Sequence, residues 1–208
     1  MENSAVRIET PVSRLPDLGG PPDLAFALTF DDGPEEPWTS AVLDRLESAG
    51  VPATFFVLGR KIAGNERTLR RMAELGCGIE VHSWEHVRMT HQSPDQVTDD
   101  IRRTAELIRE TTGRSPRFVR PPDGAVSPEV LDRIHRGGMI PAFWSIHAWD
   151  WKRPGADAIV SGVSRGLRRG AVVLLHDGGG DRSQTVEAIP HIVRIAADRR
   201  LRAVCLEA

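Results

Sequence analysis

The amino-acid sequence predicts an α/β fold in which about seven parallel strands form a (β/α) barrel within a single domain. Short apolar runs alternate with helix-period segments about seven times, which is typical of a parallel sheet with helices outside it. The length of 208 residues suits one domain with its own core. Polar residues suited to chemistry follow several of the apolar runs, as on the C-terminal rim of a barrel, which favours a barrel over an open doubly wound sheet.

Strands are expected where apolar runs end at turn-forming residues. The first run, at 25–30, is followed closely by Gly33 and Pro34, which end it in a turn. The same criterion predicts strands at 25–30, 53–58, 78–82, 117–119, 140–144, 171–175 and 203–206.

Helices are expected between these runs, where apolar residues recur every three or four positions. The clearest is 94–112, which opens on Ser93, Pro94 and Gln96 as a capping box and ends before Gly113. Helices are predicted at 38–49, 65–75, 94–112, 127–136, 155–168 and 184–198.

Composition and charge exclude several classes of protein. A net charge of −2 gives no electrostatic footprint for nucleic acid, and no apolar stretch reaches the ~18 residues of a membrane span. Residues 1–24 are predicted to be a lead segment before a folded domain at 25–208. They lack the pattern of a secretory signal, so we expect a cytoplasmic protein, or an extracellular one if the sequence is a trimmed piece. Cys77 and Cys205 are expected to be buried free thiols.

Two adjacent carboxylates, Asp31 and Asp32, follow the first expected strand. Neighbouring like charges repel and raise the pKa of one carboxyl unless a cation lies between them. Such a pair at the tip of a strand therefore indicates a metal site or a proton-transfer task, and histidines further along the chain favour the metal.

His82 and His86 supply those histidines, after the strand expected at 78–82. Two histidines four apart converge on one cation if the backbone makes roughly one helical turn. With Asp32 they offer two imidazoles and a carboxylate, which suits Zn²⁺ or another divalent transition metal such as Co²⁺ or Ni²⁺. A polar surface pair is the alternative. The same segment also matches the H-x-x-E-H pattern of inverted zinc peptidases, with Glu85 as base, but that pattern needs a sustained helix around it.

Arg120 and His176 each follow another expected strand. A buried arginine needs a carboxylate partner, for which Asp31 and Asp150 are the candidates. The His176 imidazole is suited to act as a general acid if a carboxylate holds it in the charged form. A solvated arginine in a surface turn and a structural histidine are the alternatives.

Three of the five tryptophans lie in one segment, at Trp144, Trp149 and Trp151. Tryptophans beside polar groups are typical of a sugar-stacking wall or an apolar slot, and a structural cluster is the alternative. The glycine run at 178–180 lacks the lysine and hydroxyl residue of a phosphate-binding loop and is expected to be a flexible rim of the site.

Five segments in order, TFDDGP, HSWEH, RPPDG, WDW and LLHD, resemble the polysaccharide deacetylases of carbohydrate esterase family 4. The resemblance runs from about Ala25 to the C-terminus and implies a distorted (β/α) barrel with a bound divalent metal, commonly zinc. It implies that three residues are the metal ligands, namely Asp32, His82 and His86. It implies a base, its orienting cation, an acid and a tuning carboxylate, namely Asp31, Arg120, His176 and Asp150. It also implies a slot for the acetyl methyl group, formed by Trp151 and Leu174.

The resemblance therefore implies a metal-dependent hydrolase that removes N-acetyl groups from an acetamido sugar or glycoside. Water attack is assisted by the base, a backbone N–H near Asp123 stabilises the oxyanion, and the acid protonates the leaving amine. An O-acetyl esterase, another amide hydrolase on the same machinery and a non-catalytic carbohydrate-binding module remain alternatives.

Two positions depart from the family pattern. The family usually has an aromatic residue where Asp123 stands and a carboxylate where His147 stands. With Trp149, both are expected to contact the substrate. Because the rim loses an aromatic surface and gains a negative charge, we expect a small or cationic N-acetylated glycoside as substrate.

Overall fold

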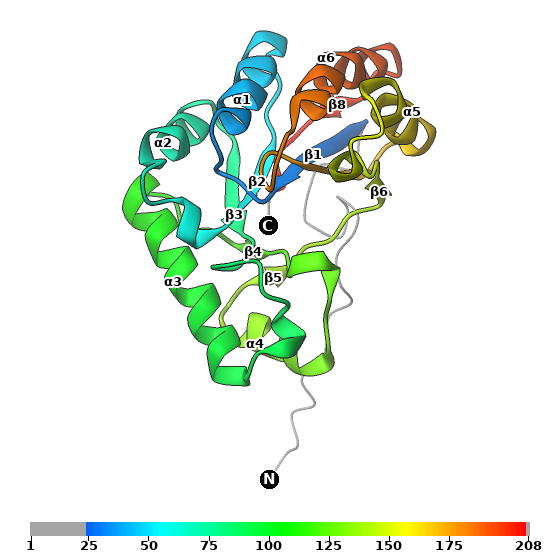
Figure 1. Ribbon diagram of the computed structural model, residues 1–208. Coiled ribbons are helices and arrows are strands. Elements are labelled where there is room, and N and C mark those ends of the chain that lie inside the picture. Colours follow the sequence, from blue (N-terminus) through cyan, green and yellow to red (C-terminus); the bar gives the residue numbers. More distant parts are fainter. Residues whose placement is uncertain (1–23, 207–208) are drawn as a thin grey trace.

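A curled parallel sheet forms the centre of the protein, and helices cover its outside (Figure 1). The structure is a computed structural model that describes residues 24–206. The strands lie in the order β5-β4-β3-β2-β1-β7-β6, and β8 pairs with β1. All the pairings are parallel, which confirms the expected α/β class. The strands are β1 (Ala25–Asp31), β2 (Thr54–Val57), β3 (Gly78–Val81), β4 (Phe118–Val119), β5 (Ile140–Pro141), β6 (Ile146–His147), β7 (Val172–His176) and β8 (Arg202–Ala203).

The sheet is a half-barrel, because no pairing in the described part of the chain joins β5 to β6. The single strand expected at 140–144 is wrong: the chain forms β5 at one edge, crosses over, and forms β6 at the other. Backbone bonds mark the crossing, since Ala142 N–H donates to Val119 O on one side and Ser145 N–H donates to Val172 O on the other. The interior therefore stays open between the two edges.

The six expected helices are confirmed, with ends that differ from the predictions by at most two residues. The capping box of the third is present, with Ser93 Oγ accepting from Gln96 N–H and the Gln96 side chain accepting from Ser93 N–H. Gly113 ends that helix at a φ of 72°, a conformation that glycine adopts without strain. The helices are α1 (Trp38–Ala49), α2 (Glu66–Glu74), α3 (Pro94–Thr112), α4 (Pro128–Arg136), α5 (Ala156–Gly166) and α6 (Ser183–Asp198).

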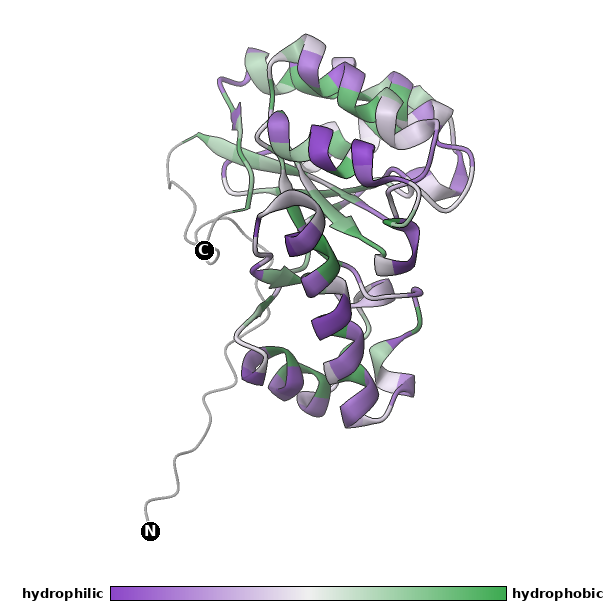
Figure 2. Ribbon diagram, turned by 90° about the vertical axis from the view of Figure 1, so that its left-hand side faces the viewer, coloured by the Kyte–Doolittle hydropathy of each residue, from purple (hydrophilic) through white to green (hydrophobic). Residues whose placement is uncertain are grey.

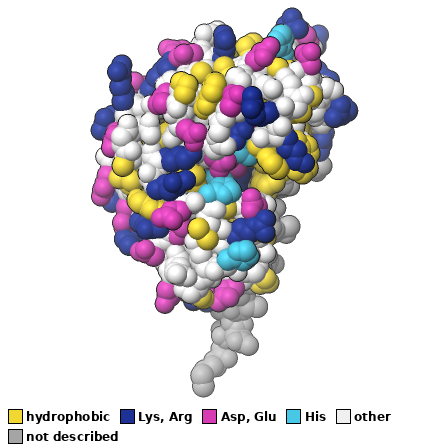
Figure 3. Space-filling model, in the orientation of Figure 1, with side chains coloured by type: hydrophobic (Ala, Val, Ile, Leu, Met, Phe, Trp, Pro, Cys, Tyr) yellow, Lys and Arg dark blue, Asp and Glu magenta, His cyan; other side chains and the backbone are white. Residues whose placement is uncertain are grey.

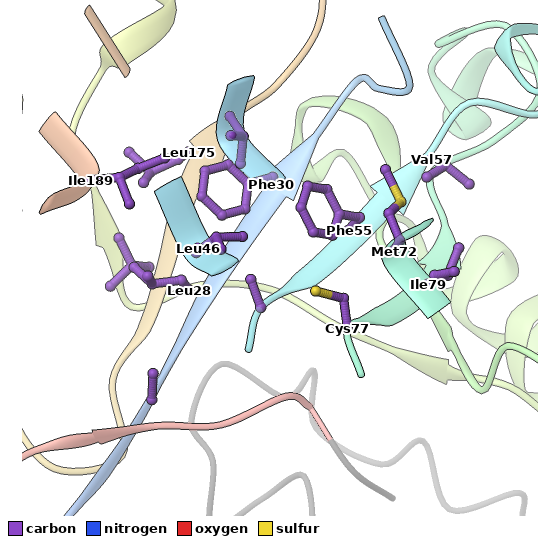
Figure 4. Close-up of a cluster of buried hydrophobic side chains, with 14 of the residues drawn as sticks. Leu28, Phe30, Leu46, Phe55, Val57, Met72, Cys77, Ile79, Leu175 and Ile189 are labelled. Atoms are coloured by element: carbon purple, nitrogen blue, oxygen red, sulfur yellow. The ribbon is translucent and has the colours of Figure 1, made fainter. Parts of the chain in front are cut away.

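The two faces of the sheet follow the alternation of side chains along each strand. On β1, Phe26, Leu28 and Phe30 pack in the core beneath the helices, where the rings of Phe30 and Phe55 stack with their centroids 5.2 Å apart (Figure 4). The helices turn their hydrophilic residues outward, as Figure 2 shows. The remaining side chains of β1 face the interior of the half-barrel, and Asp31 is the last of them.

A carboxylate replaces part of the ladder between β3 and β4, which share one register pair. Glu80 Oε2 accepts from the backbone N–H groups of Arg117 and Phe118, each at 2.7 Å. Burial raises the pKa of the Glu80 carboxyl to about 7. This side chain therefore keeps the two strands aligned just below the rim of the sheet.

The cysteines and the membrane-span prediction can be compared with the structure directly. Cys77 and Cys205 are free thiols as expected, but Cys205 is only partly buried. No helix within residues 24–206 is long and apolar enough to cross a membrane. The predicted lead segment, apart from Leu24, lies outside the described residues.

Replacing Ser93 with alanine should lower the free energy of unfolding by about 1 kcal/mol, because the backbone N–H of Gln96 loses its acceptor at the start of α3. Denaturant titration measures the change. The control is Ser164→Ala, which removes an exposed hydroxyl that bonds only Ser161 O within α5. Equal losses in the two variants would contradict the role assigned to the cap.

Candidate active site

The predicted site residues meet in one cleft of about 570 Å³ at the C-terminal ends of the strands. In Figure 3 histidine and acidic side chains lie together near the middle of this face, with basic and hydrophobic side chains around them. Parallel strands bring their C-terminal ends to one rim, so residues far apart in sequence become neighbours. The cleft is lined by Asp31, Asp32, His82, His86, Arg88, Asp123, Trp144, His147, Trp149, Trp151, Leu174, His176, Gly179 and Arg182.

Arg120 fills the interior of the half-barrel directly beneath the cleft and is fully buried. Its Nη1 donates to Asp31 Oδ1 at 2.6 Å and to Thr29 Oγ1 at 2.8 Å. Its Nη2 donates to Phe143 O at 3.0 Å, and its guanidinium lies 3.9 Å from the centroid of the Phe56 ring. Of the two expected partners, Asp31 is confirmed and Asp150 is not. One carboxylate oxygen of Asp31 is thus held, and the other faces the cleft.

Three potential ligand atoms converge beside Asp31. A carboxylate oxygen of Asp32 and one ring nitrogen each of His82 and His86 lie within 4.8 Å of one another. Asp32 Oδ1 is 3.4 Å from His82 Nε2 and 3.3 Å from His86 Nε2. His82 Nδ1 lies 2.7 Å from Arg120 O, and since a carbonyl only accepts, Nδ1 carries the proton and the Nε2 lone pair points to Asp32.

These donors fit a divalent cation. Asp32 Oδ1 is buried and has no hydrogen-bond partner in the described part of the chain, which is costly for a carboxylate oxygen. Two imidazole nitrogens and a carboxylate oxygen that face one another can all coordinate one cation. Burial alone raises the pKa of Asp32, but the imidazoles of His82, His176 and His86 outweigh burial and lower it, so this carboxyl is ionised at neutral pH.

The loop that carries the two histidines, residues 82–86 (the cation loop), is not helical. The two histidines therefore converge without the helical turn expected from their spacing, and the helix that the peptidase alternative required is absent from this segment. Ser83 and His86 instead adopt positive φ angles of 98° and 64°, a strained conformation that persists only where surrounding contacts impose it. One such contact is Asp100 on α3, whose Oδ1 accepts from Trp84 N–H at 2.8 Å in the middle of the loop.

The backbone of Asp32 is fixed from two sides. Lys61 Nζ donates to Asp32 O at 2.9 Å and pairs with Glu35, which accepts from Gly179 and Gly180 N–H. On the other side Gly178 lies so close that a Cβ there would be 2.4 Å from Asp32 O, which requires glycine. The glycine run is therefore tied to Glu35 and packed against the backbone of Asp32, and its flexibility stays a prediction.

A second histidine–carboxylate pair lies across the cleft. His176 Nδ1 donates to Asp150 Oδ1 at 2.8 Å, and Asp150 Oδ2 accepts from His176 N–H and from Thr185 Oγ1. Burial lowers the pKa of His176, but the bond to Asp150 and its charge outweigh burial and raise it. The imidazole is thus oriented with Nε2 free and with its protonated form favoured.

Aromatic side chains form one wall of the cleft. Trp149 and Trp151 are 49% and 45% exposed, and Lys152 Nζ lies 4.3 Å from the centroid of the Trp149 ring. His147 stacks on Trp149 with centroids 4.1 Å apart. Burial, together with the nearby His176, lowers the pKa of His147 and keeps it neutral. Leu174, the register partner of His147 on β7, adds an apolar surface inside the cleft.

Every expected site residue therefore lines the cleft or lies directly behind a residue that does. Four supporting residues were not expected from the sequence: Glu35, Lys61, Arg88 and Asp100. Only Asp100 has a sequence signal, because this acidic residue lies on the apolar stripe of α3 and is buried there. The other three lie on connecting segments without a recurring pattern.

The sheet and the rim place the chain in the class of α/β half-barrel proteins with a three-ligand cation site. The sequence profile of the polysaccharide deacetylase family matches residues 19–141. The chain is 38% identical over 178 residues to the chitooligosaccharide deacetylase of Bradyrhizobium sp. (strain ANU 289), covering 80% of this chain and 81% of that protein. The chain belongs to the polysaccharide deacetylase family, carbohydrate esterase family 4.

Other relatives agree with this assignment. The peptidoglycan-N-acetylglucosamine deacetylase PgdA of Listeria monocytogenes is 40% identical over 152 residues, which span 73% of this chain but 32% of that protein. Among solved structures, the Bc1960 peptidoglycan N-acetylglucosamine deacetylase superposes with a TM-score of 0.87 at 31% identity, covering 90% of this chain and 88% of that chain.

One neighbour separates fold from activity. The BA3943 protein from Bacillus anthracis is described as a pseudoenzyme of carbohydrate esterase family 4. It superposes with a TM-score of 0.83 at 27% identity, covering 93% of this chain and 66% of that chain. The fold therefore does not by itself make a member catalytic.

Replacing Asp100 with alanine should weaken zinc binding roughly tenfold, because the cation loop loses the acceptor that holds its strained backbone. Competition with a chromophoric chelator measures the affinity. The matched control is Asp99→Ala, which removes the neighbouring carboxylate on the exposed face of α3. Equal affinities of the two variants would show that the contact from α3 does not support the site.

Proposed function

We propose that this protein is a metal-dependent hydrolase that removes N-acetyl groups from acetamido sugars, with Asp31 as base and His176 as acid. The observation that carries the proposal is the pairing at the rim: a carboxylate held by Arg120 beside a cation site, and an imidazole held by Asp150 across the cleft. The deacetylase relatives support the substrate class, since they are named for chitooligosaccharides and peptidoglycan N-acetylglucosamine.

Asp32, His82 and His86 would hold the cation. Two imidazoles and one carboxylate with open positions suit Zn²⁺, with Co²⁺ or Ni²⁺ as replacements. When bound, such an ion supplies Lewis acidity, polarising a carbonyl oxygen and lowering the pKa of water.

Asp31 accepts the proton of the attacking water. Its Oδ1 is occupied by Arg120, and its Oδ2 lies 3.7 Å from His82 Nε2, next to the cation site. The bond from Arg120 keeps this carboxylate oriented, so the free oxygen is available as the base.

His176 then donates a proton to the leaving amine. An amide nitrogen cannot leave as an anion, so a protonated group must lie on that side of the scissile bond. Asp150 holds the imidazole in the required tautomer and favours its charged form. The backbone N–H of Asp123 is assigned as donor to the oxyanion, and Leu174 and Trp151 as the walls around the acetyl methyl group.

Retention of both proton-transfer groups supports an enzyme over a non-catalytic sugar-binding protein. Binding alone needs neither a carboxylate held by a buried arginine nor a histidine held by a buried aspartate. Removing a side chain such as Asp31 should therefore abolish turnover and leave the cation bound.

Asp31→Asn should keep its zinc and lower kcat by about 10²- to 10⁴-fold, because an amide cannot accept the proton. Acetate release is measured on N-acetyl chitooligosaccharides, peptidoglycan fragments and acetylated xylan, with metal content determined on the same samples. The wild type should act on the N-acetylated sugars. Normal turnover by the variant would contradict the base assignment, and preference of the wild type for xylan would indicate an O-acetyl esterase.

Asp150→Asn should shift the alkaline limb of the kcat/KM profile downward by about 1 pH unit. Asp150 raises the pKa of His176 against the effect of burial, so without its charge the protonated acid is lost at lower pH. Thr185→Val, which keeps the carboxylate and removes only a neutral donor to it, should shift the limb much less. An unchanged limb in Asp150→Asn would show that another group is the acid.

A further inference from the structure

The side chains of one ion pair at the rim have no part in the chemistry assigned above. Arg88 Nε donates to Asp123 Oδ2 at 2.6 Å, and both residues line the cleft. Arg88 follows the cation loop, and Asp123 lies in the short helix η4 (Pro122–Gly124) after β4. The pair therefore joins two loops that come from different strands and face the same bound substrate.

We propose that Arg88 and Asp123 form a subsite that binds the hydroxyl groups of a neutral sugar next to the cation site. This inference rests on the proposed function, because it assigns the part of the cleft that contacts the sugar rather than the acetyl group. The proposed subsite differs from the tryptophan wall in its chemistry, because it offers hydrogen bonds and the wall offers stacking.

The unused atoms of the pair carry the inference. Only Nε of Arg88 and Oδ2 of Asp123 are engaged with each other in the described part of the chain, so both Nη groups and Oδ1 remain available. Their side chains are 52% and 46% exposed. Adjacent hydroxyl groups of a sugar ring each donate and accept, so a group of N–H donors beside a carboxylate oxygen matches them.

Stability does not explain the pair. Exposed ion pairs contribute little to the free energy of folding because solvent screens them and two long side chains must be ordered. Asp123 moreover has a φ of 58°, a left-handed conformation that costs energy for most residues and that aspartate and asparagine tolerate best. The arrangement therefore indicates that the pair binds a ligand rather than stabilises the fold.

The charges of the pair also bear on the kind of substrate. The sequence predicted a more negative rim because Asp123 stands where the family usually has an aromatic residue. Arg88 cancels that charge, so the rim has no excess negative charge at this point to attract a cationic glycoside. The structure supports recognition of uncharged hydroxyl groups in place of the predicted preference for a cation.

Arg88→Gln and Asp123→Asn test the subsite. Asparagine matches the size of aspartate, tolerates the left-handed backbone and leaves the assigned backbone N–H in place. Glutamine is shorter than arginine and removes the charge and the guanidinium donors while keeping a polar side chain. We measure kcat and KM for an N-acetyl chitooligosaccharide and for 4-nitrophenyl acetate, which has no sugar. In either variant kcat/KM for the chitooligosaccharide, divided by kcat/KM for 4-nitrophenyl acetate, should fall roughly tenfold. The fall should come mainly from a higher KM for the chitooligosaccharide. The double variant should lose little more than either single one, because each change already breaks the pair.

Arg102→Gln is the matched control, since Arg102 forms an exposed 2.6 Å pair with Asp99 on α3 and lies outside the cleft lining. Its ratio should equal that of the wild type. An unchanged ratio in Arg88→Gln and Asp123→Asn, or equal losses on both substrates, would overturn the subsite and leave the proposed function standing. A wild type inactive on every acetylated sugar would overturn both.

Discussion

The buried contact between Arg120 and Asp31 is the interaction on which the rest of the site depends. Removing a guanidinium from water is expensive unless its hydrogen bonds are replaced. Here Asp31, Thr29 and Phe143 accept from the two Nη groups inside the half-barrel, while Nε has no partner in the described part of the chain. Arg120 also accepts a hydrogen bond from His82 Nδ1 through its backbone carbonyl. Arg120 therefore fixes the position of the assigned base and the tautomer of a cation ligand together. Breaking this contact would disturb two functions through one residue.

Around that contact, the cleft is built from loops whose backbone is strained and held from behind. Asp32, His86, Asp123 and Trp149 all line the cleft with positive φ angles. Conformations of this kind persist only when neighbouring contacts impose them. Asp100 holds the cation loop, while Lys61 and Glu35 hold the backbone of Asp32 against the glycine run. The supporting residues thus hold the candidate ligand atoms in position, and the pseudoenzyme neighbour shows that the fold alone is insufficient for activity.

The rim divides into surfaces of different chemistry. In the proposed function the cation site, Asp31 and His176 act on the acetyl group, and the tryptophan wall offers stacking. The pair of Arg88 and Asp123 offers hydrogen-bond donors and an acceptor where the family pattern usually has an aromatic ring. Replacing stacking by hydrogen bonding makes recognition depend on the arrangement of hydroxyl groups, because hydrogen bonds are directional and stacking tolerates many rings.

The order of strands and helices, the helix caps and the residue types of the site were all predictable from the sequence, because they depend on local periodicity and on chemistry carried by neighbouring residues. The ends of α1 and α3 and the capping box at Ser93 are examples. Tertiary structure alone decided two other matters: that 140–144 splits into β5 and β6 and leaves the barrel open, and that Arg88 neutralises Asp123. The partner of Arg120 lies between these cases, because local chemistry left Asp31 and Asp150 open and only the family resemblance implied Asp31, which the structure confirms. The split of 140–144 depends on which edges of the sheet can pair, and the contact of Arg88 with Asp123 joins residues far apart in sequence. Local sequence patterns contain no information about contacts of either kind.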